Sequence, residues 1–221
     1  MTSGVRNHTV GYIAPFLIYV GMIALPLPPQ ILFPVRFVIV LAAILWLSRP
    51  HLSLKPCHPL ASVAVGMAVF LLWIGPDVLF GPAYRGFWLF NNSLLGHAGS
   101  SLPTAAQRNP FFLSVRVLSS IALVPVLEEL FWRGWLMRWL IHREFLKVPL
   151  GAYQAGAFWI VALLFASEHG PYWDVGLLTG IIYNLWIIRT KNLADCILAH
   201  SVTNLALAIY VLIAGQWQYW L

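Results

Sequence analysis

The chain has 221 residues, of which 60% are hydrophobic and only 9% are charged. Soluble domains carry about 25% charged residues, so this composition excludes a water-soluble globule, and its hydrophobicity excludes a disordered chain. The formal net charge of +6 would suggest a nucleic acid partner in a soluble protein. Here the basic residues flank apolar runs, which indicates orientation in a membrane instead. We therefore expect an all-α, polytopic transmembrane helix bundle that contacts membrane lipids and no nucleic acid.

Apolar stretches long enough to cross a membrane recur along the chain, since a bilayer core about 30 Å thick needs about 20 helical residues. The expected spans are 10–27, 31–48, 60–80, 111–141, 152–169, 174–189 and 193–214. The prolines at positions 26, 28, 29 and 34 predict a tight connection between the first two spans. The fourth span is too long to be straight, and Pro125 is expected to kink it. The aromatic segment 81–110 is expected to lie at the membrane interface.

Basic residues gather in alternate connections, which predicts an integral membrane protein with its N-terminus inside. They are Arg6, Arg49, Lys55, Arg138, Arg143, Lys147, Arg189 and Lys191. The first apolar stretch lacks a cleavage site and is interpreted as an anchor rather than a signal peptide. Cys57 and Cys196 are too few for a disulfide framework or a Cys-rich metal site. We expect one membrane domain over residues 1–221.

Ionisable residues inside membrane spans are costly and are typical of functional sites. Three spans are expected to carry them, and the first holds the adjacent carboxylates Glu128 and Glu129. Glu129 precedes Arg133 by four residues, the favourable order for a helical ion pair. Glu128 points about 100° away, lacks that partner and is suited to general acid or base chemistry. The alternative is a structural ion pair that locks two helices.

Two histidines and an asparagine occupy two further spans. His169 ends the fifth span beside Glu168, which is expected to be solvated, and His169 itself could be a structural interfacial residue. His200 and Asn204 share one face of the last span. They could hydrogen-bond between helices or hold a substrate carbonyl oxygen. Together these groups are suited to activating water and attacking a carbonyl.

Gly176 and Gly180 have the spacing of a close helix contact.

Three motifs in order resemble the CAAX protease and bacteriocin-processing family of intramembrane endopeptidases, which is related to the type II CAAX prenyl proteases. They read Glu128-Glu129-x-x-x-Arg133, Phe165-x-x-x-His169 and His200-x-x-x-Asn204. The resemblance covers about 110–214, which we take as the motif-bearing core, with 1–109 as accessory spans. Residues 148–151 and 193–204 resemble a bacterial subgroup found alongside exosortase-type sorting systems, and this resemblance implies a location in a bacterial inner membrane.

The resemblance implies a role for each matching residue. Glu128 would activate water with help from His169, while His200 and Asn204 would hold the carbonyl oxygen. Glu129 and Arg133 would support the site. The substrate would be a membrane-associated or exported protein or peptide, with or without a lipid anchor. No cofactor is favoured, because a His-Glu-x-x-His helix is absent, although Glu128, His169 and His200 could ligate zinc.

Two other functions remain open from the sequence. One is a non-enzymatic immunity or scaffold protein that keeps the motifs for folding or binding. The other is a proton-coupled transporter that uses Glu128 and His200, which the lack of internal repeats makes less favourable. Alternating topology also places His169 at the outer end of its span and His200 nearer the inner side. Their convergence then requires a kink at Pro125, a short last span or an inverted topology.

Overall fold

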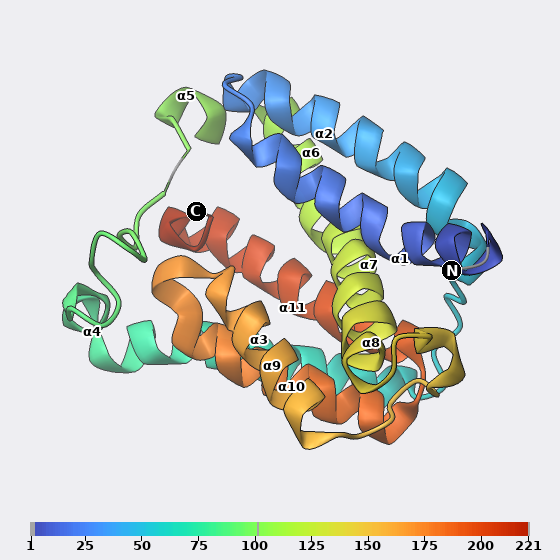
Figure 1. The fold of residues 1–221 in the computed structure, drawn as a ribbon. Helices are drawn as coiled ribbons and strands as arrows, with labels where there is room; N and C mark the ends of the chain where they lie inside the picture. Colours follow the sequence, from blue (N-terminus) through green and yellow to red (C-terminus); the bar gives the residue numbers. More distant parts are fainter. Residues whose placement is uncertain (1–2, 101, 221) are drawn as a thin grey trace.

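The computed structural model describes residues 3–100 and 102–220, and these form helices joined by loops, the longest of which lies between α4 and α5 (Figure 1). The α-helices are α1 (Ser3–Gly21), α2 (Pro29–Ala43), α3 (Pro59–Phe80), α4 (Pro82–Gly86), α5 (Thr104–Gln107), α6 (Pro110–Leu118), α7 (Val124–Glu129), α8 (Met137–Ile141), α9 (Ala155–Ser167), α10 (Trp173–Thr190) and α11 (Leu193–Ala214). The expected all-α bundle is confirmed. Each of the seven expected spans corresponds to one helical run.

Four of these helical runs are long and apolar enough to cross a membrane: Pro29–His51, Pro59–Phe80, Pro110–Ile141 and Leu193–Ala214. Two runs contain π-helical turns, at Ile44–Ser48 after α2 and at Ser119–Leu123 and Leu130–Leu136 around α7. Two shorter apolar helices cover His8–Ala24 and Ala155–Ser167. Pro34 lies inside α2 rather than in the connection. The expectation for it was wrong because membrane helices tolerate proline where neighbours satisfy the freed carbonyl.

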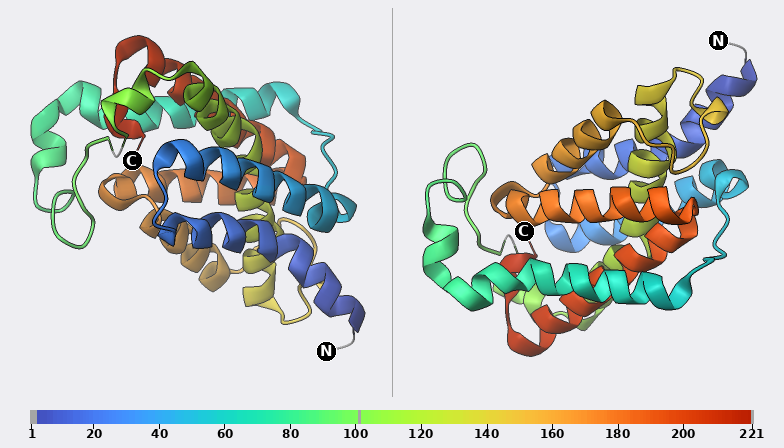
Figure 2. Two further views of the ribbon diagram at one scale, coloured as in Figure 1. Left: turned by 90° about the horizontal axis from the view of Figure 1, so that it is seen from above. Right: turned by 90° about the horizontal axis from the view of Figure 1, so that it is seen from below.

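The connections gather at two opposite ends of the bundle. The N-terminus, the end of α2, the end of α8 and the α10–α11 junction lie at one end, whereas α4, α5 and the C-terminus lie at the other (Figures 1 and 2). The first end holds most of the basic connections, and we call it the basic end. The run from α6 to α8 crosses the direction of α3 and α11, which lie side by side.

Small residues let the helices approach closely. A Cβ atom added to Gly180 of α10 would stand 3.2 Å from the Cα atom of Ala162 in α9. One added to Gly176 would stand 3.1 Å from the imidazole Nδ1 of His169. The close helix contact predicted from the Gly176–Gly180 spacing is therefore present. Gly180 contacts α9, and Gly176 contacts His169, which lies just after α9. The spacing brings backbones together because glycine has no side chain to separate them.

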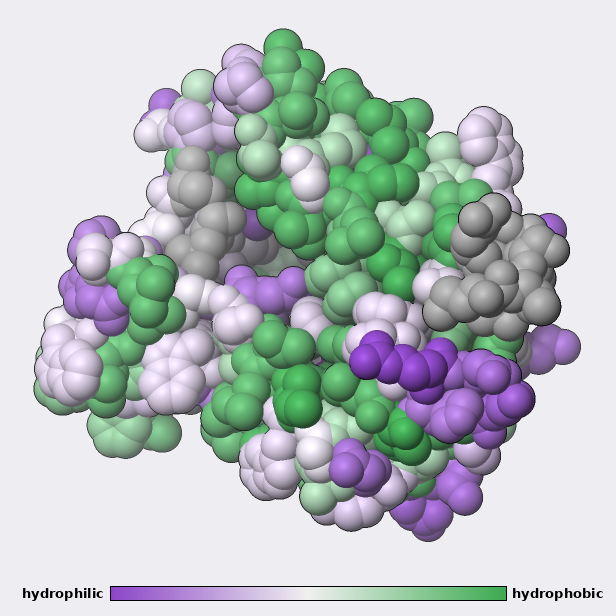
Figure 3. All heavy atoms as spheres, viewed as in Figure 1, coloured by the Kyte–Doolittle hydropathy of each residue, from purple (hydrophilic) through white to green (hydrophobic). Residues whose placement is uncertain are grey.

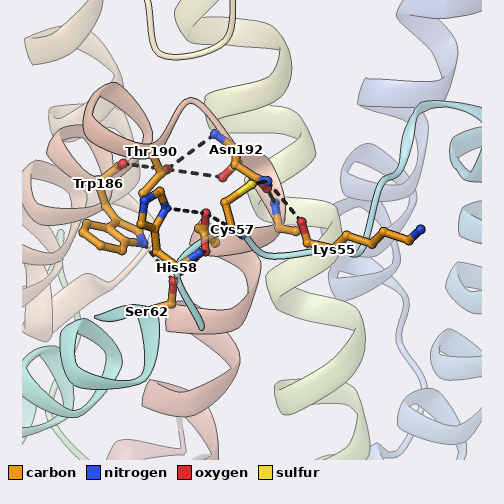
Figure 4. A network of polar contacts seen from close by, with 9 residues as sticks. Lys55, Cys57, His58, Ser62, Trp186, Thr190 and Asn192 are labelled. Carbon is orange, nitrogen blue, oxygen red and sulfur yellow. Dashed lines mark hydrogen bonds and ion pairs between the residues drawn. The ribbon is translucent and has the colours of Figure 1, made fainter. Parts of the chain in front are cut away.

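A buried carboxylate fastens α3 to α11 at the basic end (Figure 4). Asp195 is fully buried and accepts hydrogen bonds from the backbone N–H groups of Cys57 and His58 at 3.1 and 2.8 Å. It also accepts one from the Ser62 hydroxyl at 3.0 Å. Backbone N–H groups at a helix start have no partner inside the helix, so Asp195 caps α3 from another helix. Asn192 adds a hydrogen bond to the Lys55 carbonyl at 3.1 Å.

Candidate active site

A cavity of about 530 Å³ lies between the helices, and side chains from most of the long helices line it. Its lining includes all four residues expected to be catalytic: Glu128, His169, His200 and Asn204. The space-filling view shows a hollow with hydrophilic residues at its floor and mainly hydrophobic residues around it (Figure 3). The structure thus brings residues from α7, α11 and the segment after α9 to one cavity inside an apolar bundle.

Glu129 and Arg133 form the expected ion pair, and both side chains are fully buried. The Arg133 Nη1 donates to the Glu129 Oε1 at 3.2 Å. The same guanidinium donates from Nε to the Asn184 Oδ1 at 3.0 Å and from Nη2 to the Gly180 carbonyl at 3.3 Å. Asn184 in turn donates to the Phe158 carbonyl at 2.9 Å. Arg133 therefore joins the helix of the two glutamates to α10, and through Asn184 to α9.

Glu128 occupies a different environment from its neighbour. Its side chain is 14% exposed and lines the cavity, and its Oε2 is buried without a hydrogen-bond partner among the described residues. The nearest ionisable contact is the His200 Nε2 at 4.0 Å. A carboxylate with a free oxygen beside a cavity can hydrogen-bond a water molecule there. The two adjacent glutamates are thus separated into a paired carboxylate and one available to the cavity.

The two histidines have defined hydrogen-bond directions. The His169 Nδ1 lies 2.7 Å from the Phe165 carbonyl oxygen, which can only accept, so Nδ1 is the donor. In the neutral ring this leaves Nε2 with a lone pair that can accept from water. The His200 Nδ1 lies 3.0 Å from the Glu129 Oε1 and donates to it, since Glu129 is the paired carboxylate. The motif spacing Phe165-x-x-x-His169 thus reflects one turn of helix.

Asn204 makes a contact that depends on Pro125. Its Nδ2 donates to the Ser120 carbonyl at 2.7 Å. Ser120 lies in a π-helical turn in which the Val124 N–H bonds the carbonyl five residues back, at Ser119. By the same pattern Ser120 would pair with residue 125, but proline has no N–H. Asn204 satisfies the carbonyl that Pro125 leaves free, and its second N–H remains for the cavity.

His169 reaches the other residues because α9 is short. The helix has 13 residues, Ala155–Ser167, which give about 20 Å of length against a hydrocarbon core about 30 Å thick. The last span is not short, since α11 has 22 residues. Convergence was expected to need a kink at Pro125, a short last span or an inverted topology. The structure achieves it with a short fifth helix and with the crossing direction of α6 to α8 (Figure 1).

Several polar residues of the cavity were missed or misjudged from the sequence. The expectation that three spans carry the ionisable groups was wrong, because Arg36 lies in α2 and Asp77 lies in α3. Arg116, in α6, also went unnoticed, and it lines the cavity with Arg36. Glu168 is exposed as expected, yet it too lines the cavity. A search for every charge within an apolar run, rather than for motif spacings, would have found both arginines.

The arrangement offers no metal ligand set within residues 3–100 and 102–220, where no group of three or more His, Cys, Asp or Glu side chains could hold a metal ion. Glu128, His169 and His200 line the same cavity but do not form such a group. We therefore expect the residues of this cavity to act without a metal ion. A metal-free site stays a prediction that a chelator experiment tests.

Residues 110–206 match the family described as type II CAAX prenyl endopeptidase Rce1-like. This confirms the resemblance to the CAAX protease and bacteriocin-processing family over that segment, which contains all three motifs and a CAAX-protease-like fold. The match covers less than half of the chain and leaves α1 to α5 and the last residues of α11 outside it. No curated protein and no solved structure matches the chain.

Proposed function

We propose that this integral membrane protein, which carries the core of that family over residues 110–206, is an intramembrane endopeptidase that hydrolyses a peptide bond with glutamate-activated water. The observation that carries the proposal is the division between the two glutamates. The Glu129 Oε1 is bonded by Arg133 and His200 although its Oε2 has no partner, whereas Glu128 makes no hydrogen bond among the described residues and lines the cavity. A structural pair alone has no use for a second, unpaired carboxylate beside it.

In the proposed reaction Glu128 takes a proton from a water molecule in the cavity, and the His169 Nε2 accepts a hydrogen bond from the same water. The resulting hydroxide attacks the carbonyl carbon of the scissile bond. His200 and Asn204 hold the carbonyl oxygen while negative charge develops on it. Glu128 then passes its proton to the departing amine as the C–N bond breaks. The carboxylate is regenerated, and one water is consumed for each bond cut.

The position of His200 sets a condition on this scheme. Its Nδ1 donates to Glu129, so its Nε2 can donate to the carbonyl oxygen only when the ring is an imidazolium. The proposed site therefore carries His200 as an imidazolium during attack, with one proton on Nδ1 and a second on Nε2. Arg133 and Glu129 support it by fixing the ring and the helix contacts, and they do not touch the reacting atoms.

The position of the cavity within the bundle indicates which class of substrate could reach it. Its lining includes Tyr172 just before α10 and Tyr219 and Trp220 after α11, and these two segments lie at the end of the bundle opposite the basic end. If the basic end faces the cytoplasm of a bacterial inner membrane, the N-terminus is inside and this part of the cavity lies towards the outer side. This orientation suits a membrane-associated or exported protein as substrate, with or without a lipid anchor.

A chromosomal Glu128→Gln replacement in the host tests the proposal. This change keeps the size of the side chain and removes its basicity. The matched control is Glu144→Gln, because Glu144 lies in an exposed loop, where Lys147 lowers its pKa by a hydrogen bond and charge. New protein N-termini are compared by mass spectrometry. We expect at least one membrane or exported protein to stay uncut with Glu128→Gln alone. Normal processing and phenotype, with the variant folded in the membrane, would instead support a scaffold or immunity role.

A further inference from the structure

Two arginines on the cavity wall have no part in the proposed reaction. Arg36 of α2 is 5% exposed, and Arg116 of α6 has a buried Nε without an acceptor. Both line the cavity that holds Glu128. Within residues 3–100 and 102–220, neither guanidinium has a hydrogen bond or an ion pair. Charges buried in an apolar bundle are normally paired, so these two are available to an anion.

The other buried arginines of the described chain show the contrast. Each has an acceptor close by: Asp174 at 2.6 Å for Arg85, Glu129 at 3.2 Å for Arg133 and the Val148 carbonyl at 2.7 Å for Arg138. The fold therefore supplies partners for buried guanidinium groups elsewhere. Their lack at Arg36 and Arg116 distinguishes these two side chains from the structural arginines.

Aromatic rings hold both guanidinium groups in place. The Cζ of Arg36 lies 4.2 Å from the ring centroid of Tyr19 and 4.5 Å from that of Phe33. The Cζ of Arg116 lies 4.8 Å from the same Phe33 centroid and 5.5 Å from that of Trp220. Cation–π contacts orient the two groups but contribute no negative charge. Two like charges that share one ring repel, and an anion between them would relieve the repulsion.

We propose that Arg36 and Arg116 form a subsite that binds a carboxylate group on the peptide in the cavity. The planar guanidinium groups are suited to bidentate hydrogen bonds with such a group. The proposal rests on the proposed function, because the occupant of the cavity is there a peptide. A lipid phosphate is the other anion that fits two guanidinium groups, and the experiment distinguishes it. The peptide is favoured because both arginines line the same cavity as Glu128, where the proposed reaction places a peptide.

The helix sets the distance between the subsite and the bond that is cut. Arg116 precedes Glu128 by 12 residues along one helical run, which corresponds to about 18 Å between their Cα atoms. An extended peptide covers about 3.3 Å per residue, so about five residues span that length. Since both side chains reach into the cavity, the carboxylate should lie within about five residues of the scissile bond.

A binding assay that needs no cleavage tests the subsite. The full chain carrying Glu128→Gln is placed in phosphatidylcholine nanodiscs with Ala-Leu peptides of about ten residues bearing a neutral fluorophore. Three peptides are compared: one with a free C-terminal carboxylate, one with a carboxamide, and one carboxamide with a single internal Glu. We expect at least one carboxylate peptide to bind about 10- to 100-fold more tightly than the neutral peptide. Which of the two does so identifies the source of the carboxylate.

Variants of the two arginines test whether they cause the tighter binding of a carboxylate peptide. Arg36→Gln and Arg116→Gln should each abolish it and melt no lower than the parent, because an unpaired charge is removed. The Lys variants keep the charge but lose the planar fork, and should reduce the preference. The control Arg143→Gln should keep it, since Arg143 is exposed and stacks on Trp139.

Three results would overturn the subsite. The first is equal binding of all three peptides, and the second is a preference that survives in every Arg36 and Arg116 variant. The third is a lipid site: about 30 mol% phosphatidylglycerol would raise the melting temperature through these arginines, with no peptide preference. Because the assay measures binding alone, failure of the subsite leaves the Glu128 processing test standing. A chain that cuts nothing can likewise still be scored for carboxylate binding.

Discussion

Replacement of Arg133 by methionine should lower the stability of the folded protein, in addition to any effect on activity. The substitution removes the charge while retaining much of the side-chain volume. It leaves the fully buried Glu129 without its cation, and the Asn184 amide oxygen and the Gly180 carbonyl each lose a donor. Breaking a buried ion pair by removing one member costs about 3–5 kcal/mol. Because His200 still contacts Glu129 at 3.0 Å, we expect the lower end, about 3 kcal/mol.

For a domain of this size, 1 kcal/mol corresponds to roughly 2–4 °C in melting temperature, so Arg133→Met should melt about 6–12 °C lower in detergent. The control Arg143→Met should stay within about 2 °C, because exposed charges contribute little. A Glu129→Gln/Arg133→Met double variant should recover part of the loss, since the unpaired carboxylate is gone. Equal melting temperatures for the wild type and Arg133→Met would refute the supporting role of the pair.

Further variants test the remaining contacts. Asn204→Ala should melt lower, since the Ser120 carbonyl loses a hydrogen bond of about 0.6–1.7 kcal/mol. Its kcat should also fall about 10²–10³-fold with KM nearly unchanged. A variant with full kcat would refute the catalytic role of Asn204 and leave it only a role in the contact between helices. Gly180→Leu should lower expression and thermal stability by forcing α10 from Ala162, and an unchanged melt would contradict that packing. Asp195→Ala should cost about 2 kcal/mol by uncapping α3, with cleavage retained in the folded fraction. Chelators should leave cleavage unchanged, whereas loss restored by zinc would make His169 and His200 metal ligands.

The helical bundle follows from the sequence because every backbone polar group inside a membrane must be paired, which links long apolar runs to helices. The Glu129–Arg133 pair likewise follows from a spacing of four residues within one helix. Contacts between helices do not follow in the same way. The Asn204–Ser120 bond depends on a π-helical turn, and the Asp195 cap joins segments far apart in the chain.

The depth of each residue was also not predictable from span counting. Apolar runs indicate where a helix lies, but the run 152–169 extends beyond the 13-residue helix that it contains. Because α9 is shorter than the apolar run, His169 lies at the cavity. The role of Arg36 and Arg116 could not be predicted from the sequence for a related reason. A charge in an apolar run is structural or available to a ligand depending on whether the fold brings a partner near it.

Glu128 is proposed to activate a water molecule that cuts a peptide bond. The most direct measurement is a single-turnover cleavage in heavy-oxygen water, with purified protein in liposomes and the protein left uncut by Glu128→Gln cells as substrate. Activated water predicts one heavy oxygen in every new C-terminal carboxylate from the first turnover, and no cleavage by Glu128→Gln. Ordinary oxygen in the first-turnover product would indicate attack by a protein carboxylate instead, and cleavage by Glu128→Gln at the wild-type rate would contradict the account altogether.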